Sequence, residues 1–311
     1  MKFLRLIRIQ NLLMLALMQS VFHFGFLKKQ VGVLGLDNWQ FFLLVLSTIC
    51  IAGAGYLIND VFDRNIDAVN KPQRVVIGNG ISEAMAYNIY VGMNCVGVGI
   101  GFYLSNLIEK PGFSAIFIVI AATLYLYASS FKKSLIIGNL VVAIILAVSV
   151  LIVGVFDLLP LINPQSQGAL GVLFKILIDY AVFAFLINLI REIVKDFEDK
   201  EGDLDYSVKS LPIVFGERIS KIVVSVLLVL AIGLLMWYNF NYLFENDLFI
   251  AVIYVFALIL APLIYTLIRL WGASQKTDYA HLSLILKLII LFGILSILVV
   301  SFNIESVKNI G

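Results

Sequence analysis

Long apolar segments run through most of this 311-residue chain and restrict what it can fold into. A helix that crosses a bilayer needs about 20 apolar residues. Hydrophobic residues make up 61% of the chain and charged residues 14%, against about 25% charged in soluble domains. Nine segments qualify as spans: 9–27, 39–58, 88–108, 112–130, 135–156, 172–190, 221–240, 248–270 and 283–303. The sequence predicts an all-α, polytopic membrane bundle of nine transmembrane helices, in a single domain over residues 1–311.

The distribution of Lys and Arg predicts the orientation of this bundle. With the N-terminus in the cytoplasm, 17 of the 22 Lys and Arg residues fall on the cytoplasmic side, as the positive-inside rule requires. Lys2, Arg5 and Arg8 precede the first apolar segment without a small-residue cleavage site, which indicates a retained span. We therefore expect an integral protein of the cytoplasmic membrane with its N-terminus inside. The net charge of +2 and the lack of a basic arm indicate no nucleic-acid partner.

Two acidic motifs follow the second and the sixth predicted spans. Both use steps of three and then four residues, in Asp60, Asp63 and Asp67 and again in Asp196, Asp199 and Asp203. Such steps keep side chains on one face of a helix, where like charges repel one another unless a cation neutralises them. Four spans separate the motifs, so we expect both at the same membrane face. Mg²⁺ binds carboxylate oxygens and shares them with substrate phosphates, so the motifs predict a magnesium site.

Basic residues on the same predicted face complete a diphosphate site. Lys and Arg bind phosphate oxygens directly, and a diphosphate beside an apolar bundle indicates a substrate with a lipid tail, such as an isoprenyl diphosphate. The predicted contacts are Lys71, Arg74, Lys132, Lys133, Lys195 and Lys209. Departure of the diphosphate leaves an allylic carbocation, which the ring of Tyr127 is placed to stabilise. The predicted partners are therefore the lipid bilayer, the diphosphate and a membrane-embedded acceptor.

At these residues the chain resembles the UbiA family of intramembrane prenyltransferases. The resemblance lies in Asn59-Asp60-x-x-Asp63-x-x-x-Asp67, Asn70-Lys71-Pro72-x-Arg74, Lys195-Asp196-x-x-Asp199-x-x-Gly202-Asp203, Lys209-x-Leu211-Pro212, Lys132-Lys133, Gly138-Asn139 and Asn11. It implies an all-helical bundle that transfers a prenyl group from its diphosphate with Mg²⁺ as cofactor. By the same resemblance, Asn59 and the six aspartates bind Mg²⁺-diphosphate, and Asn11, Lys71, Arg74, Asn139 and either Lys132 or Lys133 contact substrate.

The run from Arg191 to Asp199 is similar to the branch of the family that prenylates geranylgeranylglyceryl phosphate. The basic residues on this face exceed the need of one diphosphate, and Lys132, Lys133 and Arg191 are candidate contacts for a second phosphate on the acceptor. Glu192 and Glu198 are candidates for a proton acceptor, although pairing with a neighbouring Lys or Arg is the simpler role. Two other functions fit the motifs: an aromatic prenyltransferase of quinone biosynthesis, with 4-hydroxybenzoate or a naphthoate as acceptor, and a cation transporter.

Overall fold

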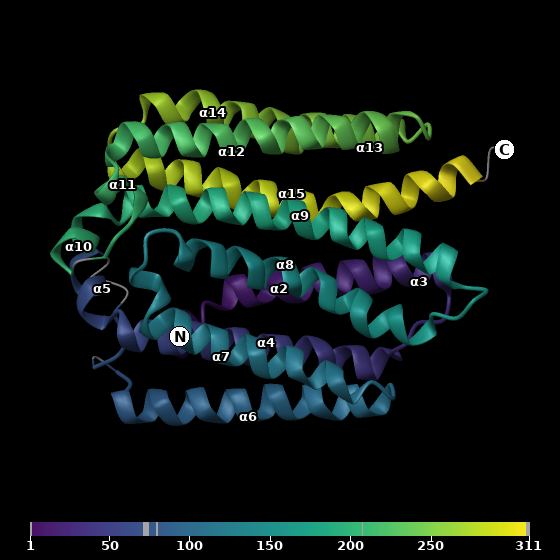
Figure 1. Cartoon of the computed structure of the whole chain (residues 1–311), viewed down its shortest axis with the longest axis horizontal. Helices are drawn as coiled ribbons and strands as arrows, with labels where there is room; N and C mark the ends of the chain where they lie inside the picture. Colours follow the sequence, from purple (N-terminus) through teal and green to yellow (C-terminus); the bar gives the residue numbers. More distant parts are fainter. Residues whose placement is uncertain (1, 71–74, 79, 207, 309–311) are drawn as a thin grey trace.

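The computed structural model of this protein describes residues 2–70, 75–78, 80–206 and 208–308. Within these residues every regular element is a helix, and the long helices lie side by side in one bundle (Figure 1). Eight helical segments are long and apolar enough to cross a membrane: Ile9–Val31, Asn38–Phe62, Pro111–Ser129, Ile137–Leu161, Gln167–Glu198, Gly216–Phe244, Phe249–Gly272 and Lys276–Ser306. The predicted all-α membrane bundle is confirmed.

Long helices alternate with short ones along the chain. The first half holds α1 (Lys2–Leu6), α2 (Ile9–Ser20), the π-helical η1 (Val21–Leu27), α3 (Lys28–Val31), α4 (Asn38–Phe62), α5 (Arg64–Asn70), α6 (Glu83–Leu107), η3 (Pro111–Phe113), α7 (Ser114–Ser129), η4 (Phe131–Lys133), α8 (Ile137–Asp157) and η5 (Leu159–Leu161). The second half holds α9 (Gln167–Glu198), α10 (Lys200–Asp205), α11 (Leu211–Val214), α12 (Gly216–Tyr238), η6 (Asn239–Phe244), α13 (Phe249–Val255), η7 (Phe256–Leu260), α14 (Ala261–Gly272) and α15 (Lys276–Lys308).

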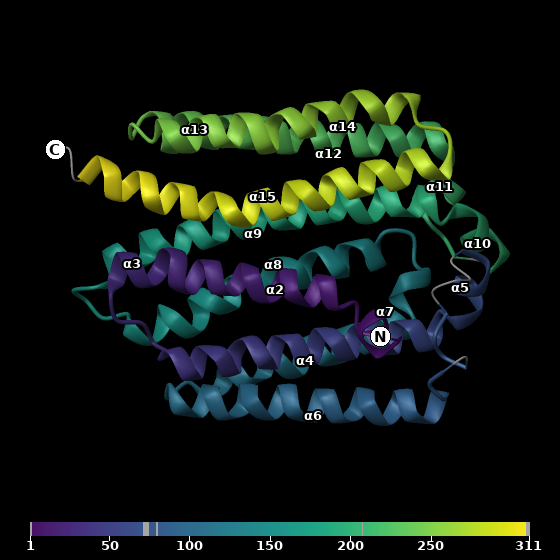
Figure 2. The same cartoon turned by 180° about the vertical axis from the view of Figure 1, so that it is seen from behind.

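The predicted span 88–108 falls in α6, which is not among the eight apolar segments. This helix is 25 residues long, but three Tyr, three Asn and four Gly lower its apolar character. It packs along α4 for most of its length (Figure 2). A Cβ on Gly97 would lie 2.6 Å from Ile51 Cγ1, and the Ser47 hydroxyl donates to the Gly97 carbonyl at 2.6 Å. Small residues allow this close helix contact, which is the usual basis of helix association in membranes.

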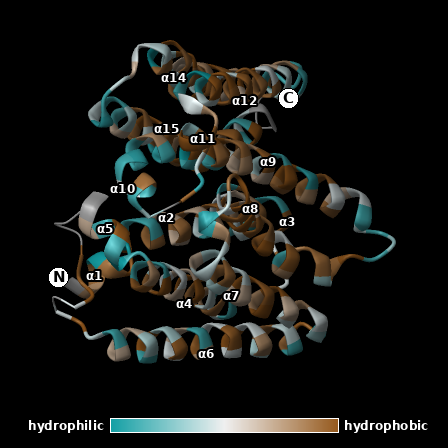
Figure 3. Cartoon of the chain, turned by 60° about the vertical axis from the view of Figure 1, so that its left-hand side comes forward, coloured by the Kyte–Doolittle hydropathy of each residue, from teal (hydrophilic) through white to brown (hydrophobic). Residues whose placement is uncertain are grey.

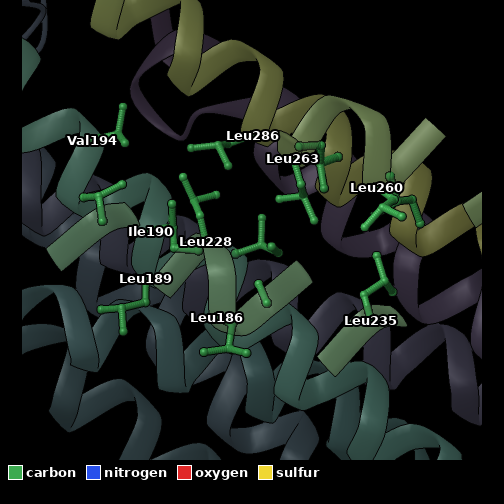
Figure 4. Close-up of a cluster of buried hydrophobic side chains, with 14 of the residues drawn as sticks. Leu186, Leu189, Ile190, Val194, Leu228, Leu235, Leu260, Leu263 and Leu286 are labelled. Atoms are coloured by element: carbon green, nitrogen blue, oxygen red, sulfur yellow. The ribbon is translucent and has the colours of Figure 1, made fainter. Parts of the chain in front are cut away.

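Two apolar clusters fill the bundle. One joins α9, α12, α13, α14 and α15, and includes Leu186, Ile190, Leu228, Leu263 and Leu286 (Figure 4). The other joins α2, η1, α4, α7, α8 and the first part of α9. Helices α9 and α15 contribute to both clusters, so they form the shared wall against which both halves of the bundle pack.

Both acidic motifs lie at one end of the bundle. The short helices α5 and α10 pack against each other there, at the left of Figure 1 and at the right of Figure 2. Parts of this end consist of hydrophilic residues, drawn in teal in Figure 3, whereas the long helices are mainly hydrophobic. The prediction that the two motifs meet at the same end of the bundle is confirmed.

Candidate active site

The two motifs share one backbone plan. In each, the first aspartate lies in the last turn of a long helix, the second ends that helix, and the third lies on the short helix that follows. Asp63 has φ −87° and ψ −2°, and Asp199 has φ −96° and ψ 5°. The amide of Asp67 donates to the Asp63 carbonyl at 2.8 Å, and that of Asp203 to the Asp199 carbonyl at 3.1 Å. The repeated spacing in sequence thus gives a repeated turn in the structure.

The carboxylates of the first motif bind cations from other parts of the chain. Arg8 Nη2 lies 3.0 Å from Asp60 Oδ1. The Lys132 ammonium donates to Asp63 Oδ2, which also accepts from Asn59 Nδ2 at 2.5 Å. Burial lowers the pKa of Lys132, but Asp63, Tyr127 and Asp67 together raise it more, so the pKa lies above its ordinary value. Lys132 therefore stays charged and holds Asp63 in place.

The second motif has a different set of contacts. Asp196 Oδ2 accepts a hydrogen bond from the neutral amide of Asn139 at 2.7 Å. The nearby cations pair with another residue, since Lys195 Nζ lies 2.9 Å and Arg191 Nη1 3.3 Å from a carboxylate oxygen of Glu192. For Glu192, the predicted pairing with neighbouring cations is confirmed.

A glycine allows Lys132 to reach the first motif. Lys132 belongs to the short turn η4, which packs on the start of α8. A Cβ on Gly138 would lie 3.1 Å from both the Lys132 Cα and the Phe131 carbonyl oxygen. The next residue, Asn139, points its amide at Asp196. The Gly138-Asn139 pair therefore places one contact at each motif.

Tyr127 lies on α7, near the first motif. Its hydroxyl is within electrostatic range of Lys132, Glu192, Asp63 and Arg8, and a Cβ on Gly138 would lie 3.4 Å from Tyr127 Cε2. The role of its ring toward a substrate stays a prediction.

A second set of polar residues lies deeper in the bundle. Asn11 on α2 donates to the Tyr56 hydroxyl at 3.4 Å and accepts from Lys287 Nζ on α15 at 3.2 Å. The Arg8 guanidinium stands 5.0 Å from the centre of the Tyr56 ring. Arg191 Nε donates to the Ser283 carbonyl, one helical turn before Lys287, at 3.4 Å. Asn11 and Arg191, both predicted site residues, thus share one region.

Sequence reasoning missed Arg8, Tyr56 and Lys287 as site residues. Arg8 was counted only among the charges that set orientation, and nothing local in the sequence links it to Asp60. A signal for Lys287 did exist, because it interrupts the apolar run 283–303. Ionisable residues within membrane spans are rare and usually functional.

The donor set at the motifs fits Mg²⁺. It consists of carboxylate and amide oxygens, and Asn59 Oδ1 is buried with no hydrogen-bond partner among the described residues. Nowhere in the described part of the chain do three carboxylate, His or Cys side chains gather closely enough to enclose a metal. Mg²⁺ is commonly held by one or two carboxylates, with water and substrate phosphates as its other ligands. The arrangement therefore matches an ion that binds together with a diphosphate.

The remaining predicted contacts lie at the rim or beyond the described residues. Lys133 and Lys209 are exposed, and their segments meet where the Lys209 amide donates to the Lys133 carbonyl at 3.3 Å. Of the predicted pair, Lys132 is the residue that contacts a motif. Lys71 and Arg74 lie outside the described residues. A small hollow at the first motif is lined by Asp60, Arg64, Asp67 and residues 75–77.

An all-helical membrane bundle with paired acidic motifs and cations at one end defines a class of membrane enzyme that handles diphosphates. The UbiA prenyltransferase family profile matches residues 23–299. The chain therefore belongs to the UbiA prenyltransferase family, which confirms the resemblance found in its motifs.

Individual relatives point to one branch of that family. The digeranylgeranylglyceryl phosphate synthase of Saccharolobus solfataricus is 31% identical over 293 residues, covering 91% of this chain and 93% of the relative. The synthase of the same name from Methanobrevibacter smithii is 33% identical over 207 residues, covering 65% of this chain and 69% of the relative.

Solved structures share the fold. A structure described as digeranylgeranylglyceryl phosphate synthase in membranes has a TM-score of 0.63 and 26% identity, covering 99% of this chain and 98% of that one. A UbiA homologue from Archaeoglobus fulgidus, bound to GPP and Mg²⁺, has a TM-score of 0.60 and 18% identity, covering 96% of this chain and 99% of that one.

Proposed function

We propose that this protein is a Mg²⁺-dependent enzyme that transfers a geranylgeranyl group from its diphosphate to the free hydroxyl of geranylgeranylglyceryl phosphate. The observation that carries the proposal is the meeting of two acidic motifs and their cations at one end of a membrane bundle. The relatives named for this product, and the A. fulgidus structure with GPP and Mg²⁺, support the same assignment.

In this proposal the carboxylates of both motifs, with Asn59, face one diphosphate. Bound Mg²⁺ would neutralise the diphosphate and so favour its departure. Lys132 and Arg8, which bind Asp63 and Asp60, turn to phosphate oxygens when the substrate enters. Asn139 fixes the orientation of Asp196. Lys71, Arg74, Lys133, Lys195 and Lys209 are also proposed to contact phosphate.

The reaction breaks the bond between C1 of the prenyl chain and the diphosphate oxygen, and forms an ether bond from C1 to the acceptor oxygen. Diphosphate leaves with the bonding electrons, and the hydroxyl proton must pass to a base. Tyr127 lies near Lys132 and Asp63, and in this proposal its ring stabilises positive charge on the allylic carbons. Glu192 is already paired with Lys195 and Arg191, so we assign it a structural role rather than that of the base.

We also propose that α6 is a ninth span and that both motifs face the cytoplasm. Helix α6 has the length of a span and packs beside α4. Of the 22 Lys and Arg residues, 17 fall on the motif side.

In a variant without Cys50 and Cys95, single cysteines at exposed Glu201 and Lys133 should resist an impermeant thiol reagent in intact cells. A cysteine at exposed Glu109 should react. Labelling of the first two from outside would overturn the orientation.

The choice of acceptor is tested by mass spectrometry of the products. Purified protein receives Mg²⁺, geranylgeranyl diphosphate and an equimolar mixture of geranylgeranylglyceryl phosphate and 4-hydroxybenzoate. We expect digeranylgeranylglyceryl phosphate as the product. Prenylated 4-hydroxybenzoate with the glycerophosphate untouched would replace the proposal with the quinone-pathway alternative.

A further inference from the structure

The deeper polar region carries more positive than negative charge. Two cations, Arg191 and Lys195, share the single carboxylate of Glu192. Among the described residues no carboxylate oxygen lies within 4.0 Å of Lys287 Nζ, whose hydrogen-bond partner is the amide oxygen of Asn11. Arg8 is matched by Asp60. Arg191 and Lys287 are thus two cations inside the bundle, and among the described residues Glu192 is the one carboxylate that pairs with either of them.

Such charges are costly within a membrane unless an anion compensates them. Lys287 is half-buried, and the Arg191 side chain is 21% exposed. Both can therefore be reached by a ligand that enters the bundle. A phosphate monoester carries a charge of about −1.5 to −2 and would therefore compensate these two cations.

The position of this region separates it from the diphosphate. Arg191 precedes Asp199 by eight residues on α9, or about 12 Å along the helix axis. Lys287 lies eleven residues into α15, which begins at the motif end, or roughly 16 Å from the helix start. The motif carboxylates and Lys132 occupy the outer level, and Arg8 joins the two levels through Asp60 and the Tyr56 ring. Arg191, Lys287 and Asn11 form a second level below it, where helices α2, α9 and α15 meet.

We propose that Lys287 and Arg191, with Asn11 as a neutral donor, bind the phosphate of the acceptor lipid and not the diphosphate of the prenyl donor. This inference rests on the proposed function. Glycerol carries three oxygens, and in this acceptor one is an ether and one bears the phosphate. The remaining hydroxyl is therefore close to the phosphate. A phosphate held at the second level presents that hydroxyl to C1 of the prenyl chain, just below the diphosphate.

The test measures the KM of each substrate separately in the purified full-length protein with Mg²⁺. Lys287→Gln and Arg191→Gln should each raise the KM for geranylgeranylglyceryl phosphate about tenfold or more, equal to about 1.4 kcal/mol. The KM for geranylgeranyl diphosphate should change less than about threefold. Lys287→Arg should restore most of the acceptor affinity, because it returns the charge. Lys175→Gln is the matched control, since Lys175 lies at the far end of α9 and donates to the Tyr242 hydroxyl.

A second measurement uses wild-type protein alone, so its result does not depend on whether a variant folds. Wild-type protein should use geranylgeranylglyceryl phosphate with a kcat/KM at least about tenfold above that for geranylgeranylglycerol, which lacks the phosphate. Equal values for the two acceptors would overturn the inference. The inference would also be overturned if Lys287→Gln and Arg191→Gln raised the KM for geranylgeranyl diphosphate and not that for the acceptor, while wild-type protein still makes the ether product. If wild-type protein prenylated neither glycerolipid, the proposed function would fall and this inference with it.

Discussion

The two acidic motifs have nearly the same backbone, but their carboxylates are held in different ways. Asp60 and Asp63 each bind a cation that comes from more than fifty residues away, Arg8 or Lys132. Asp196, which matches Asp60 in the repeat, accepts a hydrogen bond from the neutral Asn139. Lys195 stands where the first motif has Asn59, and it pairs with Glu192.

This difference gives the motifs different tasks in our account. Cations of the protein already neutralise part of the first motif, so Mg²⁺ and diphosphate must compete with Arg8 and Lys132 there. At the second motif, the amide of Asn139 orients Asp196 without adding charge, so among the described contacts Asp196 has no hydrogen-bonded cation that Mg²⁺ must displace. Substitutions at the contacts of the first motif should therefore have a different kind of effect from those at the second, although both motifs bind one substrate.

The largest effect should come from the carboxylates that end the two long helices. Asp63→Asn and Asp199→Asn should each lower kcat/KM by about 100-fold or more, equal to about 2.7 kcal/mol, because each removes a charge facing Mg²⁺-diphosphate with little change of shape. Steady-state prenyl transfer measures this. The control is Asp247→Asn, an exposed position in the turn before α13. Turnover close to wild type in either motif variant would remove that motif from the site.

A smaller effect is expected for Lys132→Gln. The change frees Asp63 from its cation but also removes a phosphate contact, and a hydrogen bond between charged groups is worth about 1.5–3 kcal/mol. The KM for the prenyl diphosphate should rise about tenfold or more. The neighbouring Lys133→Gln, at an exposed position, should change it less than about threefold. Equal effects at the two lysines would contradict the assignment of Lys132.

Loss of the hydrogen bond between Asn139 and Asp196 should lower activity less than loss of Lys132. Asn139→Ala removes the hydrogen bond to Asp196 without changing any charge, and kcat/KM should fall about five- to tenfold, near the low end for a bond to a charged group. Asn106→Ala serves as the control, since this exposed amide bonds only a carbonyl of its own helix among its described contacts. If Asn139→Ala lowered kcat/KM as much as Lys132→Gln does, or more, the contacts that hold the two motifs would be equally strong.

The smallest expected effect concerns Mg²⁺ without substrate. Lys132→Gln removes a positive charge beside Asp63, so the Mg²⁺ concentration that gives half of the maximal thermal stabilisation should fall about threefold. Asn139→Ala should leave that concentration within about twofold, because no charge changes. The measurement is Tm against Mg²⁺ in the absence of any diphosphate. A weaker Mg²⁺ response in Lys132→Gln would mean that the lysine does not compete with the ion.

Periodicity and spacing were enough to predict most of the architecture. Apolar length predicted the spans, and the even number between Asp67 and Asp196 predicted that the motifs meet at one face. Helix α6 was the exception in apolar character, because it carries Gly, Asn and Tyr residues, of which Gly97 packs against α4 and Gly101 against α7. A length criterion finds such a helix, whereas a hydropathy criterion does not.

The contacts that distinguish the motifs were beyond sequence reasoning. Arg8 and Asp60 are 52 residues apart, and Lys132 and Asp63 are 69 apart. Both pairings depend on how α2, η4 and α4 pack, and no local pattern encodes that. Lys287 was equally hidden until α15 was placed beside α2, although its position within an apolar segment marked it as unusual.

The central claim is that both motifs bind the same diphosphate. Calorimetric titration of the purified protein with a non-reactive geranylgeranyl thiodiphosphate, in the presence of Mg²⁺, tests it most directly. We expect one ligand per chain in the wild type. Asp63→Asn and Asp199→Asn should each weaken binding strongly, and the double variant should bind little worse than either one, because both act on one site. Two ligands per chain, or full binding in either single variant, would contradict the claim.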